Sequence, residues 1–473
     1  MATDLTMAIL ERGMLHAENS YFIPNIRIIG NAWKTNLPSN VAFRGFGQPQ
    51  GMAVIEEAIE AIACYLGKEP LDIRRINYYD TKSRNIAPYG AEVKQNHLLR
   101  IEGEILKSSN YLKRKAEIDA FNANSKHIKR GISLTPVKFG ISFTTSFLNQ
   151  AGALIHIYAD GSVQVNHGGI EMGQGLNTKM IQVAAAELGV NIDRIKLTPT
   201  NTSKVPNTSA TAASSGSDLN GMAIKNAVGQ LKERLLPVAA QILAEEFETK
   251  VDAKNVIIEN DYVFDQSKPK ITLPFETIAS KAYLFQTHLS AAGYYRTPDI
   301  WFDRAKGVGK PFHYYTYGMA VSEVEVDTLE GRVKLLRARI IEDAGETINE
   351  QLDIGQVIGG FVQGLGWVTT EDIKWNEKGR ILNASPDTYK IPTINDIPVD
   401  FEVKLLEKAP NDNTIRRSKA VGEPPFPLAL SAFYAIKYAI ASLADHKVEP
   451  KLNIPATNEE IVLSIRDLEK RMK

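Results

Sequence analysis

An order of elements that occurs twice, about 170 residues apart, is the feature that most restricts how this chain can fold. In each copy two apolar segments flank a glycine turn, and glycine-rich sequence and an apolar helix follow. The first copy turns at Asp160-Gly161, a strong hairpin signal, and the second turns near Glu330-Gly331. Because hairpins and helices are mixed rather than alternating as strand–helix units, we predict an α+β fold with a weak internal duplication.

Local signals predict further helices. Apolar residues at Ile55, Ile59 and Ile62 lie on one face of a helix predicted over 51–66, and this face is expected to be buried. Pro70 is typical of the first turn of a helix and opens the next one. The N-terminal part of the chain is therefore expected to be largely helical.

Two longer segments complete the secondary-structure prediction. Residues 106–130 are polar and rich in lysine, which is typical of a solvated helix that links two regions, and β-structure is expected to begin at Gly140. The most apolar stretch, 428–444, has about the minimum length of a membrane span but contains Ser431 and Lys437. We therefore predict a buried helix there.

The composition restricts the possible functions. The 473 residues include 55 Lys plus Arg and 55 Asp plus Glu, so the formal net charge is zero. A neutral chain lacks the positive charge of a nucleic-acid-binding or basic membrane-surface protein. The single cysteine, Cys64, excludes an internal disulfide framework and cannot hold an iron–sulfur cluster by itself. Since residues 1–12 also lack the apolar core of a secretory signal, we expect a cytoplasmic protein.

Two glycine-rich segments carry residues suited to binding. The segments 43–51 and 167–175 each lead into a helix, where free backbone N–H groups attract anions. Gln174 can both donate and accept hydrogen bonds, which suits the amide edge of a heterocycle. The structural alternatives are a tight turn with a helix cap for the first segment and a hairpin exit for the second.

Two further segments lead into apolar helices. Residues 209–217 are small and rich in hydroxyl groups, so that they suit either phosphate binding or a flexible surface loop. In 418–425, Glu423 stands beside Pro424 and Pro425, and such a rigidly aimed, partly desolvated carboxylate suits a general base. A glutamate that complements the dipole of a helix N-terminus is the alternative.

No segment has the spacing of a metal site formed by side chains. The eight histidines are scattered, and neither an HExxH nor a CxxC pattern occurs. His167, the histidine closest to a glycine-rich segment, is interpreted as structural. We therefore predict no metal held by direct side-chain ligation.

Taken in their order, these segments resemble the molybdenum-cofactor-binding portion of the xanthine dehydrogenase and aldehyde oxidase family, and the resemblance to xanthine dehydrogenases is the closer one. The resemblance extends from about residue 9 to residue 445. It is specific because seven strings occur in the family's order. These strings are AFRGFGQPQGM, KFGISFTTSFLNQAGALIHIYADGS, GGIEMGQGLNTKM, VPNTSATAASSGSDLNG, FVQGLGW, TYKIP and SKAVGEPP.

The resemblance implies a molybdenum hydroxylase component that converts hypoxanthine and xanthine to urate, with water as the oxygen source. Glu423 matches the family's general base, and Arg12 matches the arginine that orients a purine and stabilises charge on it. Phe46 and Phe143 match the aromatic residues that hold the flat substrate between them, and Thr144 matches a hydroxyl contact to its edge. Members that prefer aldehydes usually lack the cation at the position of Arg12, so a purine is favoured over an aldehyde or another N-heterocycle.

The resemblance also implies a molybdenum–molybdopterin cofactor, whose nucleotide form the sequence does not indicate. The residues that match the family's cofactor contacts are Arg44, Met172, Gly173, Gln174, Ala212, Ala213, Ser214 and Gln363. By the same comparison, we expect the tail of a first molybdopterin-binding domain, a helical linker, a second such domain and a C-terminal tail. Their expected bounds are 1–85, 86–130, 131–450 and 451–473.

The chain departs from the family in extent and at single positions. The family's molybdenum region is normally much longer on its N-terminal side, and it works with iron–sulfur and flavin domains that this sequence does not contain. We therefore expect a heteromer in which other chains supply the N-terminal half, the iron–sulfur clusters and FAD. A truncated, cofactor-free remnant is the alternative. Gln48 stands where the family commonly has glycine, and Phe426-Pro427 replaces a more usual aliphatic pair.

Overall fold

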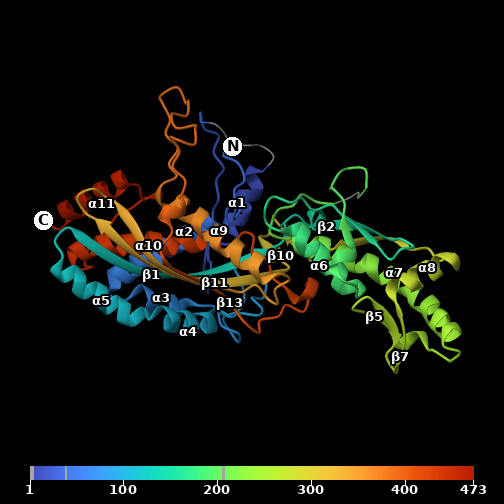
Figure 1. The fold of residues 1–473 in the computed structure, drawn as a ribbon. Coiled ribbons are helices and arrows are strands. Elements are labelled where there is room, and N and C mark those ends of the chain that lie inside the picture. Colours follow the sequence, from blue (N-terminus) through green and yellow to red (C-terminus); the bar gives the residue numbers. More distant parts are fainter. Residues whose placement is uncertain (1–4, 38–39, 205–207) are drawn as a thin grey trace.

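The computed structural model describes residues 5–37, 40–204 and 208–473, which form two lobes side by side (Figure 1). The larger lobe, on the left of Figure 1, is built on a four-stranded sheet in the order β1-β11-β12-β13. The first three strands pair antiparallel, and β13 runs parallel to β12. The bounds are Ile128–Ile141 for β1, Tyr314–Asp327 for β11, Val333–Glu342 for β12 and Asp400–Leu405 for β13.

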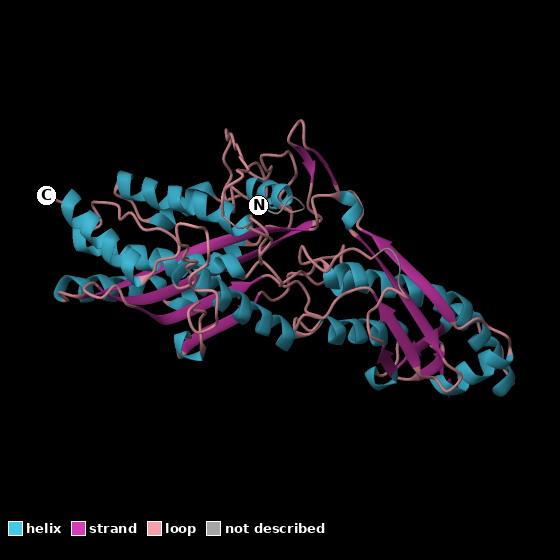
Figure 2. Cartoon of the chain, turned by 90° about the horizontal axis from the view of Figure 1, so that it is seen from above, coloured by secondary structure: helices cyan, strands magenta, loops and turns pink. Residues whose placement is uncertain are grey.

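The smaller lobe contains a second four-stranded sheet, in the order β4-β3-β2-β8. Here β2 pairs antiparallel with β3 and β8, and β4 runs parallel to β3. Figure 2 shows the strands of the two lobes as separate groups. The bounds are Gln150–Ile157 for β2, Val163–His167 for β3, Ile195–Leu197 for β4 and Ser290–Arg296 for β8.

The two sheets confirm the predicted duplication. Each contains a hairpin, then a helix, a strand parallel to the second hairpin strand, and a second helix: β2-β3-α6-β4-α7 in one lobe and β11-β12-α9-β13-α10 in the other. A fourth strand, β8 or β1, pairs antiparallel with the first hairpin strand. The helix bounds are Leu176–Leu188 for α6, Gly216–Glu246 for α7, Glu350–Thr369 for α9 and Leu430–Ala441 for α10. We call these two copies the first repeat (150–246) and the second repeat (314–441).

The second helix of each repeat packs across its own sheet, so the two cores are built alike. Helix α7 covers β2 and β8, and α10 covers β1 and β11. With its flanking 3₁₀ turns, the apolar segment Phe426–Ala444 is the one span among the described residues that is long and apolar enough to cross a membrane. Because 78% of its apolar window is buried inside the structure, it is a core helix, as predicted.

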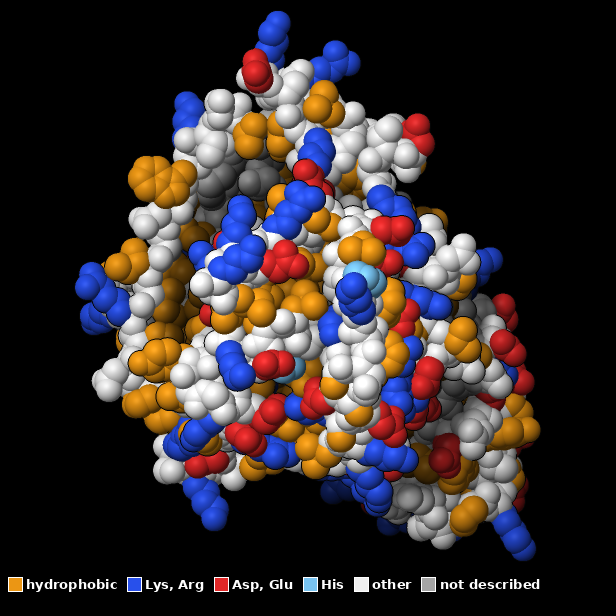
Figure 3. Space-filling view, turned by 90° about the vertical axis from the view of Figure 1, so that its left-hand side faces the viewer, with side chains coloured by type: hydrophobic (Ala, Val, Ile, Leu, Met, Phe, Trp, Pro, Cys, Tyr) orange, Lys and Arg blue, Asp and Glu red, His pale blue; other side chains and the backbone are white. Residues whose placement is uncertain are grey.

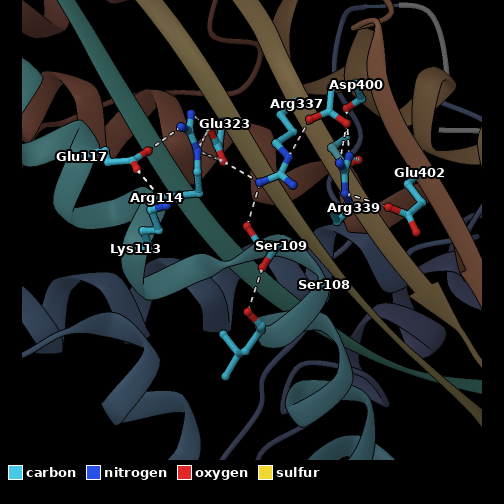
Figure 4. A network of polar contacts seen from close by, with 12 residues as sticks. Ser108, Ser109, Lys113, Arg114, Glu117, Glu323, Arg337, Arg339, Asp400 and Glu402 are labelled. Atoms are coloured by element: carbon cyan, nitrogen blue, oxygen red, sulfur yellow. Dashed lines mark hydrogen bonds and ion pairs between the residues drawn. The ribbon is translucent and has the colours of Figure 1, made fainter.

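The segment expected to be a solvated linker is instead bound to the larger sheet. It forms two helices, α4 (Leu98–Ser109) and α5 (Tyr111–Asn124), which pack on that sheet, and β1 begins at Ile128 rather than near Gly140. Figure 4 shows how Arg114 of α5 and Arg337 of β12 both bind Glu323 of β11. These ion pairs bind α5 to the sheet, while other side chains of the helix, such as Lys113, are exposed, so the polar composition indicated the solvated face but not the packing. The predicted domain boundaries stay a prediction.

The N-terminal helices are α1 (Thr6–Met14), α2 (Gln48–Leu66) and α3 (Pro70–Asn77), of which α3 begins at Pro70 as predicted. The buried face of α2 was predicted wrongly, because Ile62 is 45% exposed whereas Glu56 is fully buried. Glu56 accepts hydrogen bonds from Arg74, which explains how a charge lies in the core. The remaining elements are α8 (Phe275–Leu284), α11 (Asn458–Arg471), the β5-β6-β7 sheet (Val256–Glu259, Tyr262–Asp265, Lys268–Pro274) and the β9-β10 hairpin (Trp301–Asp303, Val308–Lys310).

Candidate active site

Glu423 lies where three of the four segments predicted from the sequence meet. Its Oε2 atom accepts a hydrogen bond from the Ser214 hydroxyl at 2.9 Å, and its Oε1 atom accepts one from the Gly45 backbone N–H at 3.2 Å. The Glu423 backbone N–H also donates to the Ser214 hydroxyl oxygen at 2.9 Å. With a side chain only 13% exposed, Glu423 is held by both of its carboxylate oxygens in a largely desolvated place.

Arg12 reaches the same place from α1. Its guanidinium donates from Nη1 to the Ser142 carbonyl at 2.8 Å and from Nη2 to the Gly140 carbonyl at 2.6 Å. The Nη2 atom lies 3.8 Å from Oε2 of Glu423, and Arg12 is 2% exposed. Burial lowers the pKa of Arg12 and the Glu423 charge opposes this, but an arginine remains cationic. The site therefore pairs a buried cation with a carboxylate.

Arg44 connects this pair to α9. Its Nε atom donates to the Gly422 carbonyl, and its two Nη atoms lie within 3.3 Å of the side-chain oxygens of Gln363 and Gln356. Among the described residues, no carboxylate forms an ion pair with Arg44. Burial lowers its pKa, and Glu423 raises it. A partly buried cation that contacts only carbonyl groups suits an anionic ligand.

The predicted substrate residues lie on the backbone next to these groups. Phe46 follows Gly45, which donates to Glu423, and Phe143 follows Ser142, which binds Arg12. Both rings are half-buried, and neither pairs with another aromatic ring in the part of the chain that the structure describes. Thr144 is buried, and its hydroxyl donates to Oε2 of Glu11 at 2.7 Å. Its oxygen therefore remains free to accept a hydrogen bond.

Tight turns bring these segments together. Gly47 has a φ of 95°, and a Cβ atom there would lie 2.2 Å from the Ile9 carbonyl oxygen, so only glycine lets α1 approach the start of α2. Ala213 and Ser214 both have positive φ, at 54° and 56°. Consecutive residues of this kind at a functional site are locally strained and are held by their surroundings.

The segment 167–175 behaves differently from what the sequence suggested. The backbone N–H groups of Gly173, Gly175 and Asn177 donate to the carboxylate of Glu171, so the anion at the start of α6 is supplied by the chain itself. The amide of Gln174 bonds within the same loop, to Met172 N–H and the Ile170 carbonyl. These residues are largely exposed: Met172 is 67% exposed.

The structure therefore does not bring Met172, Gly173 and Gln174 into hydrogen-bond contact with Arg44 or Glu423, among the residues it describes. The loop adjoins the site indirectly, since the Ile170 N–H donates to the Thr211 hydroxyl three residues before Ser214. Ala212, Ala213 and Ser214 lie at the site by chain continuity, whereas only Ser214 binds Glu423 through its side chain.

Two buried contacts that sequence reasoning missed support the Glu423 segment. Lys419 and Asp343 form an ion pair at 2.6 Å with both side chains fully buried. The Tyr314 hydroxyl accepts a hydrogen bond from the Ala420 N–H at 3.0 Å and donates to Asp218 at 2.7 Å. No local pattern marks these partners, because they lie far apart in the sequence.

Gln48 and Phe426, two positions at which this chain departs from the family, are both buried. Gln48 is fully buried, and its Nε2 atom contacts the Met52 sulfur at 3.8 Å while its Oε1 atom has no partner. The ring of Phe426 stacks on Trp367, with centroids 5.4 Å apart.

His167 is buried beneath its loop, and its Nδ1 atom accepts a hydrogen bond from the Gly169 N–H at 3.0 Å. In the part of the chain that the structure describes, no three His, Cys, Asp or Glu side chains are grouped as a metal site would require.

Comparisons with known proteins identify the family and the fold. The sequence profile of the molybdopterin cofactor-binding domain matches residues 104–398, more than half of the chain, and a second profile of that description matches residues 1–78. The fold is also similar to that of quinoline 2-oxidoreductase from Pseudomonas putida 86, with a TM-score of 0.83, 21% identity, and coverage of 98% of this chain and 58% of the other. It is similar, too, to that of the aldehyde oxidoreductase of Desulfovibrio desulfuricans ATCC 27774, with a TM-score of 0.79 and 23% identity. That match covers 98% of this chain and 45% of the other.

The chain belongs to the molybdopterin cofactor-binding domain family. Within it, the chain is a member of the xanthine dehydrogenase family. It is 42% identical over 470 residues to the xanthine dehydrogenase of Dictyostelium discoideum. It is 44% identical over 463 residues to the xanthine dehydrogenase/oxidase of Gallus gallus. These alignments cover 98% and 97% of this chain and 32% of each relative. The chain thus spans about a third of the length of the curated relatives it matches.

The residues present fit the cofactor that this family binds. Arg44 offers a cation that forms no ion pair among the described residues, Gln363 offers an amide, and Ser214 offers a hydroxyl oxygen, since its O–H group already donates to Glu423. An anionic pterin is the kind of ligand that such a donor set stabilises. Arg44, Ser214 and Gln363 are the residues of this chain that would hold it.

Proposed function

We propose that this chain is the substrate-orienting and base-bearing part of a molybdenum hydroxylase that oxidises hypoxanthine and xanthine to urate in purine breakdown, with water as the oxygen source. The observation that carries the proposal is the Arg12–Glu423 pair, in which a buried guanidinium lies 3.8 Å from a largely buried carboxylate. Such a pair can take a proton and stabilise negative charge at one place.

Glu423 is the proposed base. Its Oε2 atom already accepts a hydrogen bond from the Ser214 hydroxyl and lies 3.8 Å from Nη2 of Arg12, so that oxygen is occupied. Its Oε1 atom receives only the 3.2 Å bond from Gly45, so the proton is taken up at Oε1. The molybdenum cofactor, when bound, supplies the acceptor for the two electrons of the oxidation.

Arg12 is the proposed purine-orienting residue. Oxidation of a purine ring places negative charge on its nitrogen and oxygen atoms, and a desolvated cation stabilises this charge more strongly than an exposed one. The Nη1 and Nη2 atoms of Arg12 each use one N–H group on a backbone carbonyl and keep a second one. Phe46 and Phe143 hold the flat ring, and aromatic pairs add about 0.5–1.5 kcal/mol beyond the area that they bury.

We propose further that the chain works in a cytoplasmic heteromer with chains that supply the N-terminal half of the molybdenum region, the iron–sulfur clusters and FAD. Two irregular segments, 22–37 and 370–399, carry large apolar side chains in solvent. They project together at the top of Figure 1, and the upper part of Figure 3 shows hydrophobic side chains around a hollow. Exposed apolar side chains that gather in this way are typical of interaction sites. Examples are Ile29 (65% exposed), Trp33 (73%), Leu382 (61%) and Ile394 (80%).

The metal content of the protein tests this proposal. The tagged chain, purified from its native host, is expected to retain partner chains and to contain molybdenum in near-stoichiometric amount by mass spectrometry. A preparation with neither molybdenum nor a partner would overturn the proposal and would identify the chain as a cofactor-free remnant.

The substrate is tested separately with Arg12→Met in the assembled protein. If a purine is the substrate, kcat/KM for xanthine falls by about 10²–10³-fold, the usual effect of removing one electrostatic stabiliser. Unchanged turnover of an aldehyde or of another N-heterocycle, with xanthine not turned over by the unaltered protein, would assign the substrate to those classes instead.

A further inference from the structure

We propose that His16 is a positioning residue for Arg12, because it fixes the backbone of Arg12 to the same residue of β1 that binds the Arg12 guanidinium. This inference rests on the proposed function, in which Arg12 orients the substrate. His16 lies one helical turn after Arg12, at the end of α1, and it is fully buried.

The hydrogen bonds of His16 define its tautomer. The backbone N–H of Gly140 can only donate, and it lies 2.9 Å from Nε2 of His16, so Nε2 is the acceptor and carries no proton. The proton is therefore on Nδ1, which lies 2.8 Å from the Arg12 carbonyl oxygen, an atom that can only accept. Burial, followed by the charges of Arg12 and Lys138, lowers the pKa of His16 well below its usual value, which keeps the ring neutral.

Main chain and side chain of Arg12 thus share one anchor. The Gly140 N–H is bound through His16 to the Arg12 carbonyl, and the Gly140 carbonyl accepts directly from Nη2 of Arg12 at 2.6 Å. The Nη1 atom binds the Ser142 carbonyl two residues further on. A shift of His16 would move the backbone of Arg12 relative to both carbonyl groups that orient its guanidinium.

The same two aromatic rings support both side chains. The ring of His16 lies 5.4 Å from Phe139 and 4.8 Å from Phe312, between centroids. The guanidinium carbon of Arg12 lies 5.0 Å and 5.4 Å from the centres of these rings. The imidazole therefore fixes the apolar surface on which the guanidinium rests, besides bonding to the backbone.

Three substitutions separate these contributions. His16→Phe keeps an aromatic ring but removes both hydrogen bonds. His16→Gln places an amide where Nε2 lies and retains a partner for Gly140, whereas His16→Asn places one where Nδ1 lies and retains a partner for the Arg12 carbonyl. His97→Gln is the matched control, since His97 is half-buried and its ring packs against Tyr317 outside this cluster.

The readout is the ratio of kcat/KM for xanthine to kcat/KM for an aldehyde, measured in the assembled protein. A positioning role predicts that His16→Phe lowers the xanthine value by about 10–100-fold, mostly through KM, and changes the aldehyde value by less than about threefold, because a small displacement of an orienting group is costly only where that group is used. Gln or Asn should restore part of the ratio. An equal loss for both substrates would mean a merely structural histidine and would overturn the inference.

A second readout does not depend on activity. In a crystal structure of His16→Asn or His16→Phe, the Arg12 guanidinium is expected to leave at least one of the Gly140 and Ser142 carbonyl groups. An unmoved guanidinium would overturn the inference even if the protein turned over no xanthine. Failure of the unaltered, assembled protein to oxidise xanthine would instead count against the proposed function.

Discussion

The two repeats share one topology but use their connections in opposite ways. In the first repeat the connection from β3 to α6 is largely exposed, and Glu171 within it binds the N–H groups at the start of the helix. In the second repeat the connection from β12 to α9 begins with Asp343, which is fully buried in an ion pair with Lys419. The N–H groups of the first loop are bound by a carboxylate of that same loop, whereas the second loop is held by an ion pair to the segment that carries Glu423.

The repeats also meet at equivalent positions. The segments that lead into α7 and α10 touch through Ser214 and Glu423. Lys179, the fourth residue of α6, forms a buried ion pair with Asp353, the fourth residue of α9. The difference teaches that the duplicated topology brings the segments together, while the anchors of each loop decide which of them is held rigidly, as the segment with Glu423 is.

Replacing Glu423 or Ser214, which meet where the two repeats are in contact, tests the difference between the repeats. The replacement of Glu423 should give the largest effect on activity. Glu423→Gln removes the proposed base but keeps an acceptor for the Gly45 N–H, so kcat for xanthine should fall by about 10²–10⁴-fold. Ser214→Ala keeps the Glu423 carboxylate but removes both hydrogen bonds that the Ser214 hydroxyl makes with Glu423, and it should cost about tenfold or less. Both are measured by steady-state kinetics in the assembled protein. Equal losses would show that the two repeats contribute equally to the chemistry.

The anchor of the second repeat is tested by Lys419→Met. The change leaves Asp343 charged and unpaired in the core, beside Glu342, whose pKa burial already raises well above its usual value. The free energy of unfolding should fall by about 3–5 kcal/mol, measured by denaturant titration. Arg417→Met, which breaks only exposed ion pairs, is the control and should cost less than about 1 kcal/mol. A small effect of Lys419→Met would argue against a rigid anchor.

The repeats explain which parts of the fold were predictable. The hairpins, α3, α6 and the buried helix α10 follow from local turns, caps and apolar runs, and the structure confirms them. The start of β1 and the buried face of α2 were missed because charged residues lie in the core there, where partners distant in the sequence stabilise them. Lys138, for example, is fully buried against Glu18.

The residues of the candidate site also fall into those that the sequence predicts and those that it does not. Arg12, Arg44, Ser214, Gln363 and Glu423 were predicted by resemblance to a family, and the structure places them together. Their roles stay predictions. His16, Asp343 and Tyr314 could not be found from the sequence, because each acts through a contact that only the fold creates. An i, i+4 spacing from Arg12 was the one local signal for His16.

A third contact between the repeats predicts a pH effect on stability. Asp218 of α7 accepts a hydrogen bond from Tyr314 of β11, and burial raises its pKa from 3.8 to about 7. The folded state therefore binds a proton on Asp218 that the unfolded state releases, so the stability from this group falls as the pH rises from about 4 to 7. Relative to Asp218→Asn, the unaltered chain should lose about 2–4 kcal/mol over this range. Denaturant titrations at several pH values measure this, and a constant difference would contradict it.

The smallest effect is expected at the loop of the first repeat. Burial opposes ionisation of Glu171, but hydrogen bonds from the N–H groups of Asn177, Gly175 and Gly173 outweigh it and lower its pKa. The stabilisation is thus present above pH 4.5, the ordinary value, and is lost as the pH falls through the lowered pKa. Because the carboxylate is exposed, Glu171→Gln should cost only about 0.5 kcal/mol at pH 7, and less near pH 3. A loss as large as that of Lys419→Met would mean that this loop is as firmly anchored as the one in the second repeat, and the contrast between the repeats would have to be abandoned.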